Sequence, residues 1–290
     1  MDEVAEFAEH RPRLFGLAYR MLGEAAEAED VLQDAYLRWA ASGPVEVPVA
    51  WLTKVVTNLC LSRLSSARAR REKYVGPWLP EPIPTDDGRL GPLETVEQRE
   101  SLSFGVLMLL ERLTPPERAA FVLREAFGYR HAEIADVLDI DEAHARQLYR
   151  RAREHVGEPR RRFTASPAHR EEIVLRFIAA ATEGDVAGLE KLLAEDVVSW
   201  SDGGGKVTAA RRPVMGPSNV ARMICGLAAH PRAAGMDIEL RTVNGRPAVV
   251  LSEAGALYMV LAFEFADDRV AALHSVLNPD KLAYAAAHGM

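Results

Sequence analysis

Apolar and polar positions follow a helical period in two short neighbouring segments, residues 131–138 and 142–154. In each segment the apolar residues share one face, and Ile140 lies at the bend between the two segments. Two short helices that meet at a tight turn form a helix-turn-helix, which places its second helix in the major groove of DNA. The pattern therefore predicts a DNA-binding element. The residues of the two apolar faces are Ile134, Ala135, Leu138, Ala145, Leu148 and Ala152.

The same period predicts a helical bundle in the first 73 residues. Three apolar stripes occur within residues 7–21, 31–39 and 51–64, and Gly or Pro residues interrupt the chain between them. The last stripe is the longest and runs into a basic segment, residues 68–73. Helices with such stripes bury them against one another. Residues 1–73 are therefore expected to form an all-helical domain with one basic end.

Residues 74–92 differ in character, because their five prolines and three glycines cannot sustain regular structure. This segment is therefore predicted to be a linker. It is not a purely polar tether, since Trp78, Leu79 and Ile83 are apolar residues that a free tether would expose to water. We expect Trp78 to dock against another part of the protein.

Helical periodicity returns in residues 93–160. A helix is predicted over residues 93–113. The next helix begins at a capping box, in which Thr114 precedes Pro115 at the first helical position and Glu117 two residues later. Together with the helix-turn-helix, these helices predict a second all-helical domain.

The remaining segment, residues 168–290, begins with helical periodicity and continues with strands. Asn244-Gly245 between two apolar runs is a strong hairpin signal, and Asp267-Asp268 separates two further runs. Helices followed by an antiparallel sheet predict an α+β domain. A helix pair packed on a curved sheet of this kind commonly encloses a cone-shaped pocket. The predicted fold class is thus multidomain, with two all-α domains followed by an α+β domain.

Length and composition fit this organisation. The 290 residues exceed the size at which one hydrophobic core keeps growing, and a hydrophobic content of 48% is ample for packed domains. No apolar run approaches the ~20 residues that span a bilayer, and the N-terminus lacks the pattern of a signal peptide, so a cytoplasmic protein without a membrane partner is expected. Cys60 and Cys225 lie far apart within apolar helical patterns. They are interpreted as core residues, and no disulfide, metal or other cofactor is expected.

The balance of charge argues against a protein that holds DNA alone. Lys and Arg number 35 against 42 Asp and Glu, which gives a formal net charge of -7 at pH 7. An unaided DNA-binding protein usually needs a broad basic surface, because neutralised phosphates supply most of the non-specific affinity. Here seven arginines lie between residues 146 and 162, whereas residues 24–34 hold five acids and no base. We infer that a larger complex supplies the remaining affinity and that the acidic segment meets a basic or hydrogen-bonding partner.

Three short motifs are unusual enough to indicate a family: Trp78-Leu79-Pro80-Glu81-Pro82, Asp202-Gly203-Gly204-Gly205-Lys206 and Asn278-Pro279-Asp280-Lys281-Leu282. Residues 1–73 resemble the region-two domain of the bacterial extracytoplasmic-function sigma factors, notably in segments 28–36 and 51–59. Residues 93–156 resemble the region-four domain of that family. The three motifs resemble those of the subgroup with a fused C-terminal SnoaL-like, NTF2-like domain, so the resemblance covers nearly the whole chain.

The resemblance implies that the protein binds core RNA polymerase, at its clamp and flap regions, and directs it to promoter DNA. Asp30, Gln33 and Asp34 are then expected to face the clamp helices. Ion pairs and hydrogen bonds at such a surface set register and association rate more than affinity. The alternative for these three residues is a solvated helix face.

By the same resemblance, four side chains in the segment that carries the third apolar stripe hold and read the melted minus-ten strand. This set is Trp51, Asn58, Ser62 and Arg63, and for Trp51 a place in the core is an equal alternative. The helix-turn-helix reads the minus-thirty-five element through its polar positions, because Arg and Gln side chains suit base edges. Arg153 is expected to meet phosphate, or else to complement the helix dipole. The predicted base-contact set is His144, Arg146, Gln147, Arg150 and Arg151.

The α+β domain suggests either regulation or catalysis. Some proteins of the wider fold superfamily are enzymes that use a pocket carboxylate or histidine, which makes Asp202, Glu264 and His274 candidates. Nothing in the sequence brings any two of them together, and a lone His on an alternating strand is more often an interior, hydrogen-bonded residue. We therefore expect a regulatory domain that is not an enzyme and is a candidate for binding a small-molecule ligand.

Our hypothesis is that the linker packs against the α+β domain and so fixes the separation of the two DNA-reading domains. Two other functions fit the same motifs: a one-component, ligand-sensing transcriptional repressor, and a SnoaL-like isomerase or cyclase fused to a DNA-binding module. The expected contact set is Trp78, Leu79 and Pro80 with Asp202, Gly203, Gly204, Gly205 and Lys206 and with Asn278, Pro279, Asp280 and Lys281.

Overall fold

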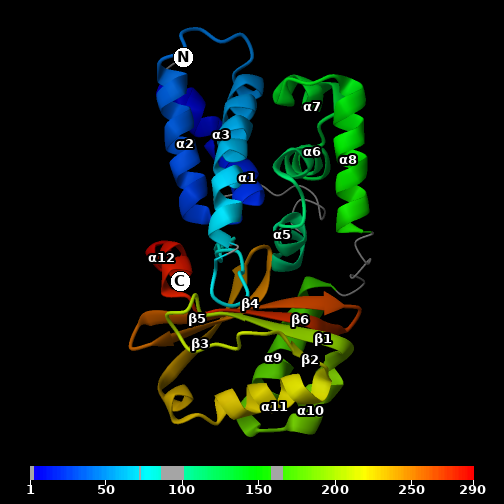
Figure 1. Ribbon diagram of the computed structural model, residues 1–290. Helices are drawn as coiled ribbons and strands as arrows, with labels where there is room; N and C mark the ends of the chain where they lie inside the picture. Colours follow the sequence, from blue (N-terminus) through cyan, green and yellow to red (C-terminus); the bar gives the residue numbers. More distant parts are fainter. Residues whose placement is uncertain (1–2, 72, 86–100, 158–165) are drawn as a thin grey trace. The chain divides into compact units, whose positions relative to one another are not determined.

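The computed structural model forms two compact units (Figure 1). The first combines residues 1–73 with 87–158, and the second combines residues 74–86 with 159–290. The segment predicted as one linker is therefore divided, and its first thirteen residues belong to the α+β unit. The residues that the structure describes are 3–71, 73–85, 101–157 and 166–290.

The first unit begins with the predicted helical bundle, formed by α1 (Glu3–Leu22), α2 (Ala25–Ala40) and α3 (Pro48–Arg71). Each apolar stripe faces the bundle interior, where Leu14 and Leu52 are fully buried. Gly23 adopts a φ of 71°, a left-handed conformation that glycine reaches without strain, and so lets α1 turn directly into α2. Cys60 is buried on α3, as its apolar surroundings predicted.

The described part of the first unit holds four more helices, which are α5 (Phe104–Leu110), α6 (Pro115–Glu125), α7 (His131–Leu138) and α8 (Glu142–Val156). The predicted capping box is present, since the Thr114 N–H donates to the Glu117 carboxylate at 3.0 Å. The helix-turn-helix is also present, and Asp139 makes its tight turn with a left-handed φ of 53°. Within the described residues, no helix is long and apolar enough to cross a membrane.

The helix predicted over residues 93–113 is shorter than expected in its described part, residues 101–113. There it runs from Phe104 to Leu110, because the Ser103 side chain accepts a hydrogen bond from the Val106 N–H and so begins the helix. Residues 86–100 and 158–165, which include the arginines at 160–162, lie outside the described part of the chain.

The second unit is the predicted α+β domain. Its six-stranded sheet has the order β2-β1-β6-β5-β4-β3. The expected hairpins occur at Asn244-Gly245 and Asp267-Asp268, but the sheet is mixed, because β1 pairs in parallel with β6. Strands that are distant in the chain can pair in parallel because a long connection crosses between them. The strands are β1 (Leu193–Asp202), β2 (Val214–Met215), β3 (Met236–Val243), β4 (Arg246–Glu253), β5 (Ala256–Ala266) and β6 (Arg269–Val276).

Three helices cover one face of this sheet, and one short helix lies on the other face (Figure 1). The covered face forms the main core, in which the Phe263 ring packs edge-on against Phe177 at 5.1 Å and beside Phe265 at 6.3 Å. The main core of the domain therefore lies between the sheet and the helices on this face. The helices on the core side are α9 (Pro167–Glu183), α10 (Val186–Leu192) and α11 (Pro217–Ala228), followed by a 3-10 turn (Pro231–Gly235), and the other is α12 (Pro279–Ala287).

Truncation of Phe263 to alanine should destabilise the second unit by about 3–5 kcal/mol, because the lost ring leaves a cavity between two other aromatic side chains. The check is a chemical denaturation curve of Phe263→Ala followed by near-ultraviolet circular dichroism. Leu175→Ala is the control, since Leu175 on α9 is 56% exposed and should change the curve little. Equal effects of the two substitutions would contradict the assignment of the core.

Candidate functional site

The linker is docked on the α+β domain around one buried carboxylate. Asp202, at the end of β1, is fully buried and accepts hydrogen bonds from the Tyr74 hydroxyl at 2.6 Å and from the Leu79 N–H at 2.9 Å. Asn278 donates from Nδ2 to the same tyrosine hydroxyl at 2.8 Å. Burial and the hydrogen bond to Asp202 raise the pKa of Tyr74, so its hydroxyl stays protonated and donates to the carboxylate at neutral pH. One carboxylate thus holds two points of the linker.

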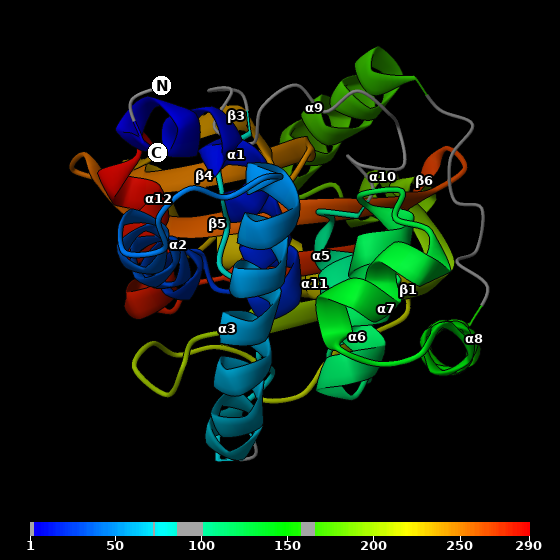
Figure 2. The same ribbon diagram turned by 90° about the horizontal axis from the view of Figure 1, so that it is seen from above.

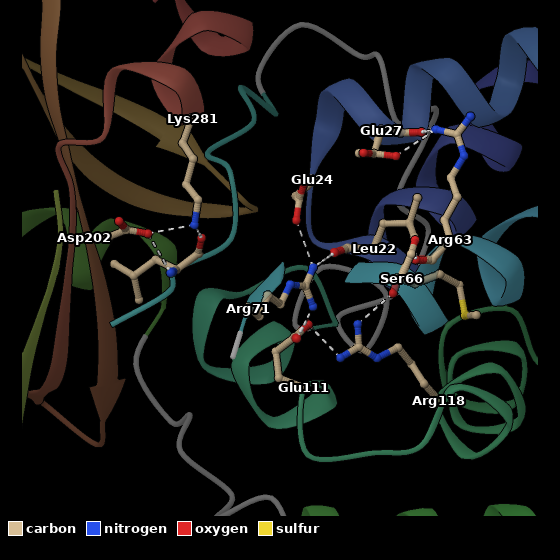
Figure 3. Close-up of polar contacts among 12 residues, drawn as sticks. Leu22, Glu24, Glu27, Arg63, Ser66, Arg71, Glu111, Arg118, Asp202 and Lys281 are labelled. Atoms are coloured by element: carbon tan, nitrogen blue, oxygen red, sulfur yellow. Dashed lines mark hydrogen bonds and ion pairs between the residues drawn. The ribbon is translucent and has the colours of Figure 1, made fainter. Parts of the chain in front are cut away.

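Lys281, in the first turn of α12, neutralises this carboxylate (Figure 3). Its ammonium lies 2.7 Å from Asp202 Oδ2 and also donates to the Leu79 carbonyl. The Lys281 and Asp202 side chains are only 6% and 0% exposed. The ammonium also lies 4.2 Å from the Trp78 ring centroid and 4.7 Å from that of Tyr74, within range of cation–π attraction. Trp78 therefore docks on a buried cation. This contact explains why the linker carries a large apolar side chain at this position.

Glycines let the loop after β1 fit against the start of α12. The Gly204 N–H donates to Asp202 Oδ1 at 3.0 Å, and its φ is +59°. A Cβ added to Gly204 would lie 2.3 Å from the Asn278 side chain, closer than real atoms approach. Gly203 and Gly205 are also tightly packed, since an added Cβ would lie 2.3 Å and 3.2 Å from neighbouring atoms. The glycine motif therefore packs directly against the motif that begins α12.

A cavity of about 230 Å³ lies beside this loop. Linker residues 75–77 form one wall, and residues from 201 to 211 form the other. Lys206 and Arg211 contribute positive charge to the lining, and Lys206 forms an exposed ion pair with Asp280 at 2.6 Å. A molecule in this cavity would contact the linker and the domain at once.

The last described part of the linker extends the sheet at the hairpin of β3 and β4. The Thr85 N–H donates to the Thr242 carbonyl at 3.1 Å, and the Asn244 N–H donates to the Ile83 carbonyl at 3.0 Å. The Asn244 side chain accepts from the Ile83 N–H at 3.0 Å. Residues 79–84, Pro80 included, are buried. Main-chain pairing at a sheet edge combined with buried side chains is the usual way in which a sheet binds an extended segment.

In the first unit, the acidic face of α2 is organised around Arg63 of α3 (Figure 3). The Arg63 guanidinium lies 2.8 Å from the carboxylates of both Glu27 and Asp34, and 3.7 Å from Asp30. Burial opposes the charge of Arg63, but the hydrogen bonds to Asp34 and Glu27 outweigh it and raise its pKa. Gln33 is exposed beside them. The residue expected to hold the minus-ten strand thus contacts carboxylates expected to meet polymerase.

The other residues expected to read the minus-ten strand share one side of α3. Trp51 is half-buried, and its ring lies 5.7 Å from that of Trp39 on α2. Asn58 lies seven residues after Trp51 and is half-buried. Ser62 lies four residues after Asn58 and is exposed. Trp51 is therefore partly a core residue and partly accessible, which leaves both alternatives for it in place.

The helix-turn-helix presents a polar face on α8, while its apolar face packs inward. Arg146 lies 3.4 Å from Glu142, an exposed ion pair one helical turn apart. Arg151 differs from the rest of the predicted set, because it is half-buried and lies 3.4 Å from Glu117 of the α6 capping box. The exposed members of the set are His144, Arg146, Gln147 and Arg150.

The three residues considered for catalysis lie on the sheet face opposite α9, α10 and α11. Asp202 is engaged by Lys281, and Glu264 lies 3.5 Å from Arg246 on the neighbouring strand. His274 is buried on β6, opposite Ala262 of β5. In the described part of the chain, no group of three or more His, Cys, Asp or Glu residues could hold a metal ion. The carboxylates thus form structural ion pairs.

Comparison with known proteins identifies the first unit. A model of Sigma-70 region 2 matches residues 7–70, and a model of Sigma-70 region 4 matches residues 104–156. The ECF RNA polymerase sigma factor SigJ of Mycobacterium tuberculosis is 41% identical over 96% of this chain and 93% of its own length. This chain belongs to the extracytoplasmic-function sigma factors. As a sigma factor it directs RNA polymerase in transcription initiation and is not itself an enzyme.

The likeness extends through the third domain of the sigma factor. The crystal structure of Mycobacterium tuberculosis SigJ matches with a TM-score of 0.78 at 38% identity, covering 97% of this chain and 98% of that one. A Mycobacterium tuberculosis protein named "Probable ECF RNA polymerase sigma factor SigI" is 31% identical over 96% of this chain and 94% of its own length. The repressor and the fused isomerase considered from the sequence are therefore set aside.

Sequence reasoning missed several members of the linker site. Tyr74 is the first residue of the linker, and an aromatic residue two positions before Gly76-Pro77 was a signal that could have been used. Asn244 was assigned only a turn, although it also binds the Ile83 backbone. Ion pairs between distant segments, such as that of Arg246 with Glu264, carry no local signal.

Replacement of Asp202 by asparagine should lower the free energy of unfolding of the second unit by about 3–5 kcal/mol, because the buried Lys281 ammonium loses its counter-charge. The matched control is Asp280→Asn, which removes an exposed lysine partner and should cost less than about 1 kcal/mol. Urea denaturation of both variants measures the difference. A small effect of Asp202→Asn would show that the pair is not buried in solution.

Proposed function

We propose that the α+β domain controls this sigma factor by holding the linker between the region-two domain, residues 1–73, and the region-four domain, residues 93–160. The observation that carries the proposal is the buried cluster in which Asp202 and Lys281 bind both backbone groups of Leu79. Such a cluster is specific, because the buried carboxylate of Asp202 and the buried ammonium of Lys281 each use a backbone group of the linker as a hydrogen-bond partner. The linker can therefore be held or released as one piece.

Release of the linker would change the reach between the two DNA-reading domains. Residues 74–86 belong to the same compact unit as the domain, and thirteen residues of extended chain can span up to about 45 Å. While the linker is docked, this length is not available to separate the region-two and region-four domains. Docking is thus proposed to restrain the polymerase-competent arrangement, and undocking to favour it.

We further propose the division of labour in the first unit. The exposed Asp30 and Gln33, with Asp34, support a role in contacting a basic surface of core polymerase, its clamp, because acidic residues on one helix face complement such a partner. Trp51, Asn58 and Ser62 share the side of α3 that would meet the melted minus-ten strand. An aromatic ring beside polar side chains can stack on a base while the polar groups hold the strand.

The exposed residues of α8 are proposed to read the minus-thirty-five element. Arg146 and Gln147 carry the side chains that pair best with guanine and adenine edges in the major groove. Arg151 is assigned a phosphate-side or structural role, because Glu117 already engages it. The flap of polymerase is the expected protein partner of this domain.

The cavity beside the glycine loop is proposed as the place where a small molecule would act on the linker. Its walls come from both the linker and the domain, so a molecule bound there would favour the docked state by its extra contacts with that state.

Trp78→Ala and Lys281→Gln should both raise run-off transcription from the cognate promoter, because each weakens the docked state of the linker. The assay uses core polymerase, full-length protein and the DNA upstream of the protein's own gene, and it includes a chain ending at Pro167. Asp280→Asn is the control, since it alters only an exposed ion pair. If the two undocking variants changed transcription in opposite directions, or not at all, control through the linker would be excluded.

Arg146→Ala should reduce initiation about 10- to 100-fold and relax base preference at one position of the minus-thirty-five element, as expected for the loss of one bidentate base contact worth about 1–3 kcal/mol. Arg153→Ala is the comparison, because a phosphate contact should weaken binding evenly for all sequences. Run-off transcription on a set of single-base promoter variants distinguishes the two patterns. An even loss for Arg146→Ala would remove it from the base-reading set.

A further inference from the structure

We propose that Arg63 serves the polymerase-binding face of α2 rather than the melted DNA strand, as a positioning residue that holds the carboxylates of Glu27 and Asp34 in the arrangement that meets the clamp. The proposal rests on the clamp role proposed above for Asp30, Gln33 and Asp34. It concerns contacts between α2 and α3, which pack together with α1 in one bundle (Figures 1 and 2).

The Arg63 side chain has a different direction from those proposed to read the strand. Ser62 belongs to the strand-reading set, and one further residue along a helix turns the side chain by about 100°. Arg63 lies seven residues after Val56 and three after Cys60, both of which are fully buried in the bundle. It therefore continues a row that faces inward, and Figure 3 shows its guanidinium directed toward Glu27 of α2.

One guanidinium joins two carboxylates that lie two helical turns apart on α2. Nη1 donates to Glu27 Oε2 at 2.8 Å and to the Glu27 carbonyl at 3.2 Å, and Nη2 donates to Asp34 Oδ2 at 2.8 Å. The planar fork of an arginine directs its donors to both carboxylates at once, whereas a lysine ammonium is a point charge on a flexible stem. Arg63 therefore fixes the conformation of two acidic side chains.

The acidic face would repel itself without this cation. Glu27, Asp30 and Asp34 follow one another at spacings of three and four residues, at which like charges on a helix repel each other. Arg63 lies 2.8, 3.7 and 2.8 Å from these three carboxylates. Its charge lets them stay close together, so they need little reordering when a basic partner arrives.

The carboxylates held by Arg63 remain accessible to a partner. The side chains of Asp30 and Asp34 are 66% and 47% exposed. A carboxylate can accept about four hydrogen bonds, so Asp34 can bind Arg63 and a cation of the clamp together. Leu37, three residues after Asp34, is 61% exposed. An exposed apolar side chain beside charged ones is suited to a protein partner, and the acidic charge selects a basic one.

The same charges oppose a DNA phosphate at this position. Three negative side chains surround the single positive charge of Arg63, so a phosphate that approached it would be repelled overall. It would also have to displace Glu27 and Asp34 from the guanidinium. The surroundings of Arg63 therefore favour a role in binding polymerase.

Arg63→Gln in the full-length protein tests the proposal, with core RNA polymerase as the binding partner. Loss of the positive charge alone would make the face more acidic and speed association with a basic clamp. Loss of positioning has the opposite effect on affinity, because the released carboxylates must be ordered at the interface. We expect the affinity to fall about 5- to 20-fold, chiefly through faster dissociation. Biolayer interferometry with immobilised core polymerase measures both rates.

A conservative variant and a double-mutant cycle separate positioning from a general loss of structure. Arg63→Lys keeps the charge without the fork and should restore part of the lost affinity. In an Asp34→Asn background, Arg63→Gln should cost less than in the unmodified protein, because Arg63 acts through that carboxylate. Arg11→Gln is the matched control, since it frees Glu29 on the same helix and should change the affinity by less than about twofold.

Binding of preformed holoenzyme to a promoter fork, melted over the minus-ten element, tests the role in DNA binding. At saturating core polymerase, holoenzyme with Arg63→Gln should bind the fork as the unmodified holoenzyme does. Trp51→Ala is the comparison, because the loss of a stacking ring from the proposed strand-reading set should weaken fork binding about 5-fold or more.

Unchanged or higher core affinity in Arg63→Gln, weaker fork binding by its holoenzyme, or additive losses in the cycle would each overturn the positioning role. If Asp30→Asn and Asp34→Asn also left core affinity unchanged, the clamp role of α2 itself would be wrong. Should Arg63→Gln fail to fold, Glu27→Ala removes one of the two carboxylates that hold the guanidinium, and the same measurements on that variant decide the question.

Discussion

The buried ion pair between Lys281 and Asp202 is the interaction on which the organisation of the α+β domain depends. Two charges removed from water are costly unless their remaining hydrogen-bonding capacity is used. Here Tyr74 and Leu79 of the linker and Gly204 of the neighbouring loop use it. The domain therefore reaches its lowest free energy only with the linker bound, and the linker becomes part of its fold.

Aromatic and glycine residues around this pair have roles that follow from it. Trp78 and Tyr74 cover the Lys281 ammonium and exclude water, which strengthens the electrostatic attraction beneath them. Gly204 allows its backbone N–H to approach Asp202 while leaving space for the Asn278 side chain. The three short motifs that indicate the family are thus parts of one contact, although 119 residues lie between the first and the second and 71 between the second and the third.

Buried cations perform the same physical task in each of the two units. Lys281 joins the linker to the α+β domain, and Arg118 joins the region-four domain to the end of α1. Both donate to backbone carbonyls of a segment distant in sequence and are neutralised by one nearby carboxylate. Such contacts are directional and specific, yet their net free energy is small because hydration competes with them.

Much of the fold is determined by local sequence. The capping box at Thr114, the left-handed turn of the helix-turn-helix and the hairpin at Asn244 each depend on a few adjacent residues, because backbone conformation and first-turn hydrogen bonds are local properties. The helix start at Ser103 was missed, although it too is local. Tertiary structure alone decided the parallel pairing of β1 with β6, the position of Arg63 among acidic residues, and the burial of Asp202. Those outcomes depend on which distant charges and strands meet, and desolvation and pairing act only once the chain has folded.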